Sequence, residues 1–248
     1  MKRALVTGAS RGIGKKIATG LCDQGYQVIA VSRNLSESDS RFTNIEGDIS
    51  DLEFVSELAN RVLKDSGHID ILVNAAGVFG PIALMHESDP HEWAQTIMID
   101  AVAPYFLINK FLPGMLANKW GRIINVSSAA SLHEPGPINS AYGTAKVALN
   151  QLTRHLASEL KGTGVTANVI HPGDVKTEMW GDIKDKVEDV GDVAINYKNW
   201  VDWVEETGGD DPQKAVDLVL KLISAASDDV NGEFCWIDNP LQAPTKSW

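Results

Sequence analysis

Short apolar runs alternate with longer amphipathic stretches along most of the chain. Apolar runs closed by glycine or polar residues predict strands at residues 3–8, 27–32, 43–48, 69–77, 121–128, 165–173 and 232–238. Apolar positions at helical spacing predict helices at about 12–24, 51–67, 90–118, 140–161 and 211–227. Alternating helices and nearly continuous apolar strands predict an α/β fold: a doubly wound parallel sheet of about seven strands with helices on both faces. No change in composition marks a boundary, so we expect a single domain, residues 1–248.

The ends of two predicted helices carry local start and stop signals. The helix at 51–67 has Asp51 or Ser50 as its N-cap and Gly67 after its last turn. The helix at 211–227 has Asp211 as its cap and Pro212 at its first position. Proline is tolerated there because a backbone N–H in the first turn has no partner within the helix.

Three stretches depart from the regular pattern. Pro104 lies inside the predicted helix at 90–118 and predicts a break or kink there. The polar connection at 34–41 is short for a crossover helix, and we expect it to be reduced to a turn. Residues 177–211 are predicted to be irregular.

Composition narrows the class of protein. The chain has 248 residues, 44% of them hydrophobic, and a formal net charge of −11, which argues against nucleic acid or an anionic membrane as a partner. Its apolar runs fall short of the ~20 residues of a membrane helix, and the first is too short for a signal-peptide core. Cys22 and Cys235 form no disulfide framework or zinc motif, and no histidines have metal-ligand spacing. We expect a soluble, cytoplasmic protein without a bound metal.

A glycine-rich turn follows the first predicted strand. Gly8, Gly12 and Gly14 permit a tight turn and a close approach of the backbone to a pyrophosphate at the N-terminus of the next helix. An ordinary strand-to-helix turn is the alternative.

The second predicted strand ends in Val31, Ser32 and Arg33, without the acidic residue that binds a ribose 2′-hydroxyl. Arg33 and Arg11 instead favour a 2′-phosphate, and hence NADP(H). Two solvated surface arginines are the alternative.

A tyrosine and a lysine lie one helical turn apart near the middle of the chain. Tyr142 and Lys146 occupy positions i and i+4 of the predicted helix at 140–161, so both side chains lie on one face. The pair is either an ordinary helix-surface pair or a phenol whose acidity the ammonium group adjusts.

Six motifs in order resemble the short-chain dehydrogenase/reductase family, in its single-domain, 3-oxoacyl reductase-like branch. They are TGASRGIG at 7–14, GDIS at 47–50, NAAG at 74–77, NVSS at 125–128, YGTAK at 142–146 and HPGDVKT at 171–177. The resemblance covers nearly the whole chain and implies a Rossmann-type fold and an oxidoreductase that uses a nicotinamide cofactor.

The resemblance also implies which residues bind the cofactor. Gly8, Gly12 and Gly14 match the glycine turn, Asp48 matches an acid that contacts the adenine amino group, and Asn74 and Gly77 match residues that line the adenine ribose. The segment of Pro172, Gly173, Val175 and Thr177 matches the one that holds the nicotinamide. The full expected set is Gly8, Ser10, Arg11, Gly12, Ile13, Gly14, Ser32, Arg33, Asp48, Ile49, Asn74, Ala75, Gly77, Tyr142, Lys146, Pro172, Gly173, Val175 and Thr177.

The resemblance assigns catalysis to Ser128, Tyr142 and Lys146. We expect Tyr142 to be the general acid in reduction and the general base in oxidation, with its pKa lowered by the ammonium group of Lys146. Lys146 is also expected to bind the nicotinamide ribose, and Ser128 to donate to the carbonyl oxygen.

One catalytic position departs from the family pattern. The family has an asparagine that anchors a water of the proton relay where this chain has Asp100. An ionised carboxylate accepts hydrogen bonds but does not donate them. Asp100 either holds the water or pairs with Lys146, and a tight pair would weaken the effect of Lys146 on Tyr142.

Residues 177–211 match the family's mobile lid. Residues 178–206 contain nine acidic residues against three lysines, which disfavours anionic substrates such as acyl-carrier or coenzyme A thioesters. The aromatic residues of this stretch are typical of an apolar pocket wall: Trp180, Tyr197, Trp200 and Trp203. The alternative is a stripe at i, i+3 and i+4 that packs a lid helix onto the body, formed by Trp200, Trp203 and Val204. We expect an uncharged ketone or secondary alcohol as substrate, and the resemblance implies a homotetramer or dimer.

Two other functions remain open. The first is a catalytically impaired NADP-binding regulatory or scaffold protein, for which Asp100 is the sequence support. The second is a 3-oxoacyl thioester reductase, which the acidic lid disfavours.

Overall fold

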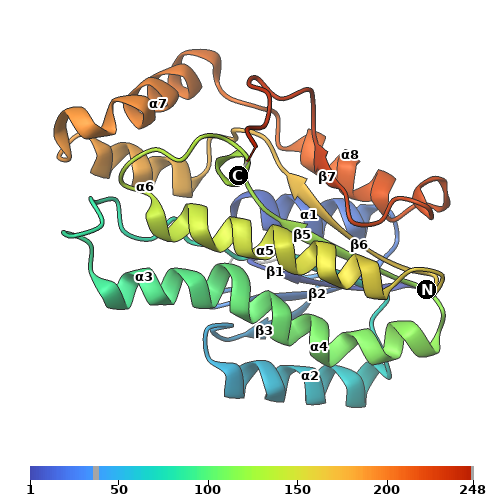
Figure 1. The fold of residues 1–248 in the computed structure, drawn as a ribbon. Helices are drawn as coiled ribbons and strands as arrows, with labels where there is room; N and C mark the ends of the chain where they lie inside the picture. The colour runs from blue at the N-terminus through green and yellow to red at the C-terminus, as the bar shows by residue number, and fades with distance from the viewer. Residues whose placement is uncertain (36–38, 247–248) are drawn as a thin grey trace.

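A parallel sheet forms the centre of the computed structural model, which describes residues 1–35 and 39–246. The described residues form seven strands, in the order β3-β2-β1-β4-β5-β6-β7 (Figure 1). They are β1 (Arg3–Thr7), β2 (Gln27–Ser32), β3 (Thr43–Glu46), β4 (Ile71–Asn74), β5 (Gly121–Val126), β6 (Val165–His171) and β7 (Phe234–Trp236). Every neighbouring pair is parallel, so the predicted fold class is confirmed.

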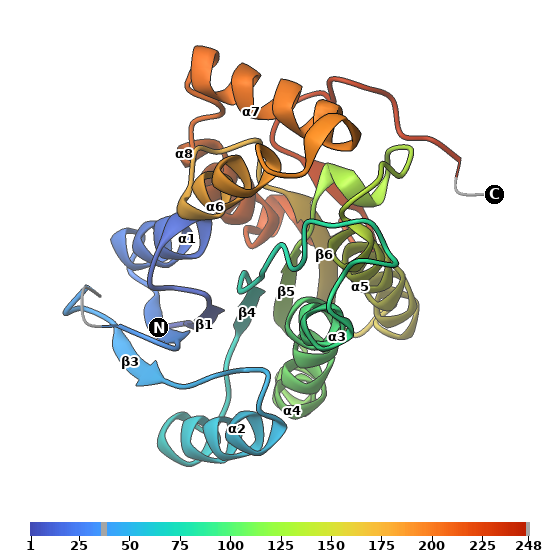
Figure 2. The same cartoon turned by 90° about the vertical axis from the view of Figure 1, so that its left-hand side faces the viewer.

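Helices cover both faces of the sheet. They are α1 (Gly12–Asp23), α2 (Leu52–Ser66), α3 (Pro90–Ile97), α4 (Ala103–Ala117), α5 (Ser140–Glu159), α6 (Glu178–Val187), α7 (Ile195–Thr207) and α8 (Gln213–Leu222). One core joins the sheet to α2, α4 and α5, and a second joins its other face to α1 and α8 (Figure 2). The strands alternate between these cores, because successive side chains of a strand point to opposite faces: Leu5 belongs to the first core, Ala4 and Val6 to the second.

The predicted start and stop signals hold for α2. Asp51 Oδ1 accepts hydrogen bonds from the N–H groups of Glu53 (2.9 Å) and Phe54 (3.3 Å), and Gly67 ends the helix at φ 75°. In the last predicted helix Asp211 Oδ1 accepts from the N–H of Gln213 at 2.9 Å. That helix ends at Leu222, however, and not at residue 227; a separate turn, Ala225–Ser227, follows it.

The helical region around Pro104 is distorted rather than broken. A π-helical turn, Met98–Val102, connects α3 to α4 and contains Asp100. Pro104 lies in the first turn of α4, where proline is tolerated. π-Turns within helices are common at functional sites, and this one orients Asp100 toward the interior, where it is fully buried.

The prediction that residues 177–211 are irregular was wrong. Helices α6 and α7 lie side by side there, apart from the two helical layers (Figure 2). A third apolar cluster holds them; it includes Trp180, Ile183 and Val187 of α6 and Val201 and Val204 of α7. Trp200 and Trp203 pack against this cluster, as the packing-stripe alternative proposed.

The connection at 34–41 was predicted to be a turn. Its described residues, 34–35 and 39–41, are not helical, and residues 36–38 lie outside the described part of the chain. Within the described residues, no helix has the length and apolar character needed to cross a membrane. No cluster of three or more potential metal ligands occurs among them either.

Candidate active site

A cavity of about 210 Å³ lies where the carboxyl ends of the central strands meet. Open α/β sheets bind ligands at this edge, because the loops that leave the strands diverge there. The predicted residues on its wall are Gly8, Ser10, Arg11, Gly12, Ile13, Gly14, Ser32, Arg33, Asp48, Ile49, Ala75, Gly77, Tyr142, Lys146, Pro172 and Thr177. The structure therefore brings together residues that the sequence spreads over 170 positions, from Gly8 to Thr177.

The glycine turn packs backbone against backbone. A Cβ on Gly14 would lie 2.3 Å from the carbonyl oxygen of Gly8, and one on Gly8 would lie 2.7 Å from Cα of Ala76. Gly8 also has a backbone φ of +67°, which residues other than glycine rarely adopt. Because Gly8 and Gly14 carry no side chains where the backbone segments meet, the backbone at the N-terminus of α1 lies on the cavity wall.

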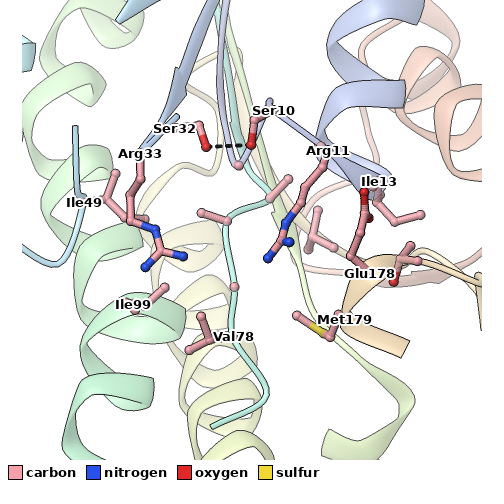
Figure 3. A pocket seen from close by; sticks show the side chains of 18 of the residues that line it. Ser10, Arg11, Ile13, Ser32, Arg33, Ile49, Val78, Ile99, Glu178 and Met179 are labelled. Atoms are coloured by element: carbon pink, nitrogen blue, oxygen red, sulfur yellow. Dashed lines mark hydrogen bonds between the residues drawn. The ribbon is translucent and has the colours of Figure 1, made fainter. Parts of the chain in front are cut away.

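Two arginines project into the same part of the cavity. Figure 3 shows Arg11 and Arg33 approaching it from opposite walls, with Ser10 Oγ and Ser32 Oγ 2.9 Å apart between them. Both arginines are exposed, and neither has an ion-pair partner among residues 1–35 and 39–246. This end of the cavity therefore suits a dianionic group.

Three predicted cofactor residues do not line the cavity. Asn74 is buried, and its Nδ2 donates to Oδ1 of Asn125 at 2.8 Å, so it connects β4 to β5. Gly173 packs against Asp210, and Val175 forms an isolated bridge with Gly209. Asp48 does line the cavity, but its Oδ1 accepts from the N–H of Ser50 at 2.9 Å.

Tyr142 and Lys146 lie at the opposite end from the arginines, in the first turns of α5. Nζ of Lys146 lies 5.3 Å from the ring centre of Tyr142 and donates to the carbonyl oxygen of Val126 at 3.0 Å. Lys146 is 4% exposed, and Tyr142 is half-buried. An ordinary helix-surface pair does not have a buried ammonium group, so this alternative fails.

Ser128 follows the wall residue Ser127 but does not itself line the cavity; it lies close enough to Tyr142 to lower the pKa of the phenol against the effect of burial. Its Oγ also accepts from the N–H of Ala130 at 3.2 Å and so caps the short helix Ala129–Ser131. Ser127, the neighbouring alternative, is 2% exposed and faces Ser131. Between the two serines, Ser128 is the one that contacts Tyr142.

Asp100 pairs with Lys146. Its Oδ2 lies 3.0 Å from Nζ of Lys146, and its Oδ1 accepts from the N–H of Val78 at 2.9 Å. A Cβ on Gly77 would lie 3.1 Å from Asp100 Oδ2 and 3.4 Å from Lys146 Nζ, so glycine leaves room for this pair. Both partners are buried, so separating them would leave each charge without compensation in the protein interior.

Burial controls the acidity of these groups. It raises the pKa of Tyr142; Lys146 opposes the rise, and the charge of Asp100 adds to it. The expected net lowering of the Tyr142 pKa is therefore wrong for the protein without ligand. Burial also raises the pKa of Asp100 against the pull of Lys146. Burial by itself would lower the pKa of Lys146, but Asp100 and Tyr142 leave it raised.

Sequence reasoning missed several wall residues. Glu178 and Met179 lie at the start of α6, on the same side of the cavity as Arg11 and Ile13 of the glycine turn (Figure 3). They were missed because the segment was taken as irregular; Thr177, whose Oγ1 accepts from the N–H of Trp180 at 3.4 Å, is the N-cap signal that marks this helix. The others come from strand ends and adjoining segments: Val31, Gly47, Ala76, Val78, Ile99, Val126 and Ser127.

Aromatic rings cover the Tyr142 end of the cavity. Phe79 stacks on Tyr142 with ring centres 4.9 Å apart, and Tyr197 of α7 meets Phe79 edge-on at 5.6 Å. Ile82 and Leu84 pack against the same cluster. The surroundings of the Tyr142 phenol are therefore mainly apolar.

Fold and site together place the chain among the Rossmann-type α/β proteins. It belongs to the short-chain dehydrogenase family, whose model matches residues 2–188. The 3-oxoacyl-(acyl-carrier-protein) reductase FabG of Haemophilus influenzae is 36% identical over 186 residues, which cover 72% of this chain and 76% of the relative. The crystal structure of the KRED1-Pglu enzyme is similar with a TM-score of 0.84 and 28% identity, over 95% of this chain and 100% of that one.

An actinorhodin polyketide ketoreductase, crystallised with NADPH, has the same fold with a TM-score of 0.84. Its identity is 24%, over 95% of each chain, so the likeness extends to the fold alone. Membership of the family makes this chain an oxidoreductase of the short-chain dehydrogenase type.

Proposed function

We propose that this protein is an NADP(H)-dependent oxidoreductase that interconverts a ketone and a secondary alcohol, with Tyr142 as general acid and base. The observation that carries the proposal is that Tyr142 and Lys146 line the same cavity as Arg11 and Arg33, while Ser128 lies next to Tyr142 just outside the cavity wall. A helix-surface pair without function would not explain why Tyr142 and Lys146 line the same cavity as the two arginines.

The residues around the cavity fit the cofactor. The turn, with glycine at positions 8, 12 and 14, and the N-terminus of α1 would provide backbone N–H groups for a pyrophosphate. Arg11 and Arg33, which have no ion-pair partner among the described residues, provide cations for a 2′-phosphate, and Val31, Ser32 and Arg33 at the end of β2 include no acid that opposes it. When bound, NADP(H) supplies or accepts the hydride.

Tyr142 then transfers the proton to or from the substrate oxygen. In reduction its phenol gives a proton to the oxygen of the substrate, and in oxidation its phenolate removes one. Ser128 has its acceptor side occupied by the N–H of Ala130, so its own hydrogen is available to the substrate oxygen. Lys146 stabilises the phenolate and, from its place on the cavity wall, would bind the nicotinamide ribose.

The substrate is uncharged, and α6 and α7 (within residues 177–211) are its lid. The rings of Phe79 and Tyr197 make the entrance to Tyr142 apolar, and the excess of acidic residues in the lid repels anions. The FabG relative supports a different candidate, a 3-oxoacyl thioester reductase. The buried Asp100–Lys146 pair supports a third, a cofactor-binding protein without turnover.

The test is NADPH consumption, followed by absorbance, against a panel of ketones, diketones, quinones and one acyl thioester mimic. Tyr142→Phe should abolish turnover of any compound that is reduced. Tyr105→Phe is the matched control, because Tyr105 is 49% exposed on α4 and lies outside the cavity wall. Preference for the thioester supports the second candidate, and NADPH binding without turnover supports the third.

Cofactor choice has its own test. Arg33→Ala should raise KM for NADPH roughly tenfold or more, the loss of one charge-assisted hydrogen bond, and leave KM for NADH unchanged. Tighter binding of NADH than of NADPH by the unmodified protein contradicts the proposal.

We also propose a homotetramer or dimer built on the outer faces of α4 and α5. Tyr105 of α4 and Val147 of α5 are each 49% exposed and would be covered there. Light scattering measures the assembly directly, and a monomer at all concentrations contradicts it.

A further inference from the structure

His171, at the end of β6, is a buried titratable residue to which the proposed chemistry gives no role. It is 8% exposed. Its Nδ1 accepts a hydrogen bond from the backbone N–H of Ala129 at 3.2 Å. Ala129 directly follows Ser128 and begins the short helix that Ser128 caps. The imidazole therefore connects β6 to the turn that carries Ser128.

Several other hydrogen bonds of this turn lie within it. The N–H of Ala130 donates to Ser128 Oγ (3.2 Å), and the N–H of Ser131 donates to the carbonyl oxygen of Ser128 (3.0 Å). These two bonds shape the turn, which is also held at both ends: the N–H of Ser127 donates to the carbonyl oxygen of Ile170 in β6 (2.9 Å), and Asn150 Nδ2 donates to Ser131 Oγ (2.8 Å). The bond from Ala129 to His171 lies between those two ends, directly after Ser128, so it bears most directly on the position of the Ser128 hydroxyl beside Tyr142.

This hydrogen bond sets the protonation state of His171. A neutral imidazole has one acceptor nitrogen, whereas an imidazolium has two donors and no acceptor. Because the N–H of Ala129 is a donor, Nδ1 must be unprotonated, and the ring proton must be on Nε2. Protonation of Nδ1 would place two donors against each other.

The surroundings of the ring favour the neutral form. Burial lowers the pKa of His171, and the charge of His133 lowers it further. The nearby carboxylates of Asp174 and Asp210 act in the opposite direction and raise this pKa. Lys214 offsets Asp210, because its Nζ lies 3.3 Å from Oδ1 of that carboxylate. The ring of Trp236 covers His171 with centres 5.1 Å apart.

We propose that His171 is a positioning residue: as the neutral Nε2–H tautomer it fixes the Ser128 turn, and its protonation releases Ser128 and slows the reaction in acid. The inference rests on the proposed function, since it assumes that Ser128 takes part in turnover.

The first test does not need turnover. Long-range ¹H–¹⁵N NMR spectra distinguish the two tautomers, and the signals of His171 are assigned by their absence in His171→Asn. At pH 7.5 the expected pattern is an unprotonated Nδ1 and a protonated Nε2. A protonated Nδ1, in the other tautomer or in an imidazolium, overturns the proposal whether or not the protein is an enzyme.

The second test is the pH profile of kcat/KM between pH 5 and 8 for three variants. In His171→Asn the amide oxygen can take the place of Nδ1 and does not titrate, so activity at pH 7.5 should be kept and the acid-side decline lost. His171→Phe keeps a planar ring without an acceptor, so its kcat at pH 7.5 should fall about tenfold and its profile should lose the acid-side decline, with KM for NADPH unchanged. His155→Gln, on an exposed histidine of α5, should keep the profile of the unmodified protein.

An acid-side decline that persists in His171→Asn overturns the proposal, and so does a His171→Phe protein with full kcat. Should His171→Phe fail to fold, His171→Asn and the tautomer spectrum still decide. Absence of turnover in the unmodified protein with every compound counts against the proposed function alone, because the tautomer is measured independently.

Discussion

Asp100→Asn is the substitution that most directly tests the electrostatics of the site. Oδ2 of Asp100 lies 3.0 Å from Nζ of Lys146, which lies 5.3 Å from the ring centre of Tyr142. The carboxylate is thus no more than about 8 Å from the ring centre. At that separation and an effective dielectric constant of about 20, it destabilises the phenolate by about 2 kcal/mol. Removing the charge should raise the phenolate population about 30-fold at a given pH.

The assay is the pH profile of kcat/KM for alcohol oxidation, in which the phenolate of Tyr142 acts as base. In Asp100→Asn the rise of the profile with pH should begin at lower pH, because burial and Asp100 together raise the pKa of Tyr142 and the second contribution is gone. Asp65→Asn removes the same charge from an exposed position of α2 and should leave the profile unchanged.

Stability must be followed in parallel. Removing one partner of a buried ion pair leaves Lys146 without compensation, so thermal unfolding should show a loss of about 3 kcal/mol. The electrostatic reasoning is refuted when a folded Asp100→Asn protein keeps the original profile or moves it to higher pH. A fall in rate at every pH would instead mean that the carboxylate itself works in the proton relay.

Three further predictions concern the scaffold. Gly14→Ala should abolish NADPH binding in a fluorescence titration and lower Tm, because its Cβ would lie 2.3 Å from a carbonyl oxygen of the backbone; binding that survives would contradict the packing of the turn. Asp51→Ala should cost about 1 kcal/mol in urea unfolding, since it removes the cap of α2; an unchanged free energy of unfolding would mean that the cap contributes nothing. Burial raises the pKa of both Tyr142 and Tyr197, so above about pH 10 the unfolded chain loses these protons first and the free energy of unfolding falls as pH rises. Tyr197→Phe should flatten that fall above about pH 10, and an identical slope would refute the assignment.

Local signals were enough to predict much of the fold. The apolar runs predicted every strand of the described sheet, and Asp51 and Gly67 marked the ends of α2. These predictions succeed because they depend on period and on single-residue backbone preferences, which neighbours in the sequence determine. Helix α6 was missed, because its stability comes from packing Trp180, Ile183 and Val187 against α7 rather than from its acid-rich sequence.

The site residues likewise fall into those that local sequence signals predict and those whose contacts depend on the fold. Of the predicted residues, those whose place follows from a strand end or a glycine turn lie on the cavity wall. Asn74 ends a strand too, but the pleat turns its side chain toward Asn125 and away from the cavity. The sequence named Asp100 as a departure and left open whether it holds a water or pairs with Lys146. The π-turn and the small Gly77 bring the two charges together at 3.0 Å.

By itself, then, the sequence determined the sheet, the glycine turn, the pair of arginines and the identity of the residues around Tyr142. Each follows from spacing along the chain or from the chemistry of one side chain. Only the tertiary structure decided the sign of the Tyr142 pKa shift, the pairing of Asp100 and the position of His171 against Ala129. These depend on burial and on distances between segments far apart in the sequence. Desolvation and charge pairing act through space, and the order of residues along the chain does not record them.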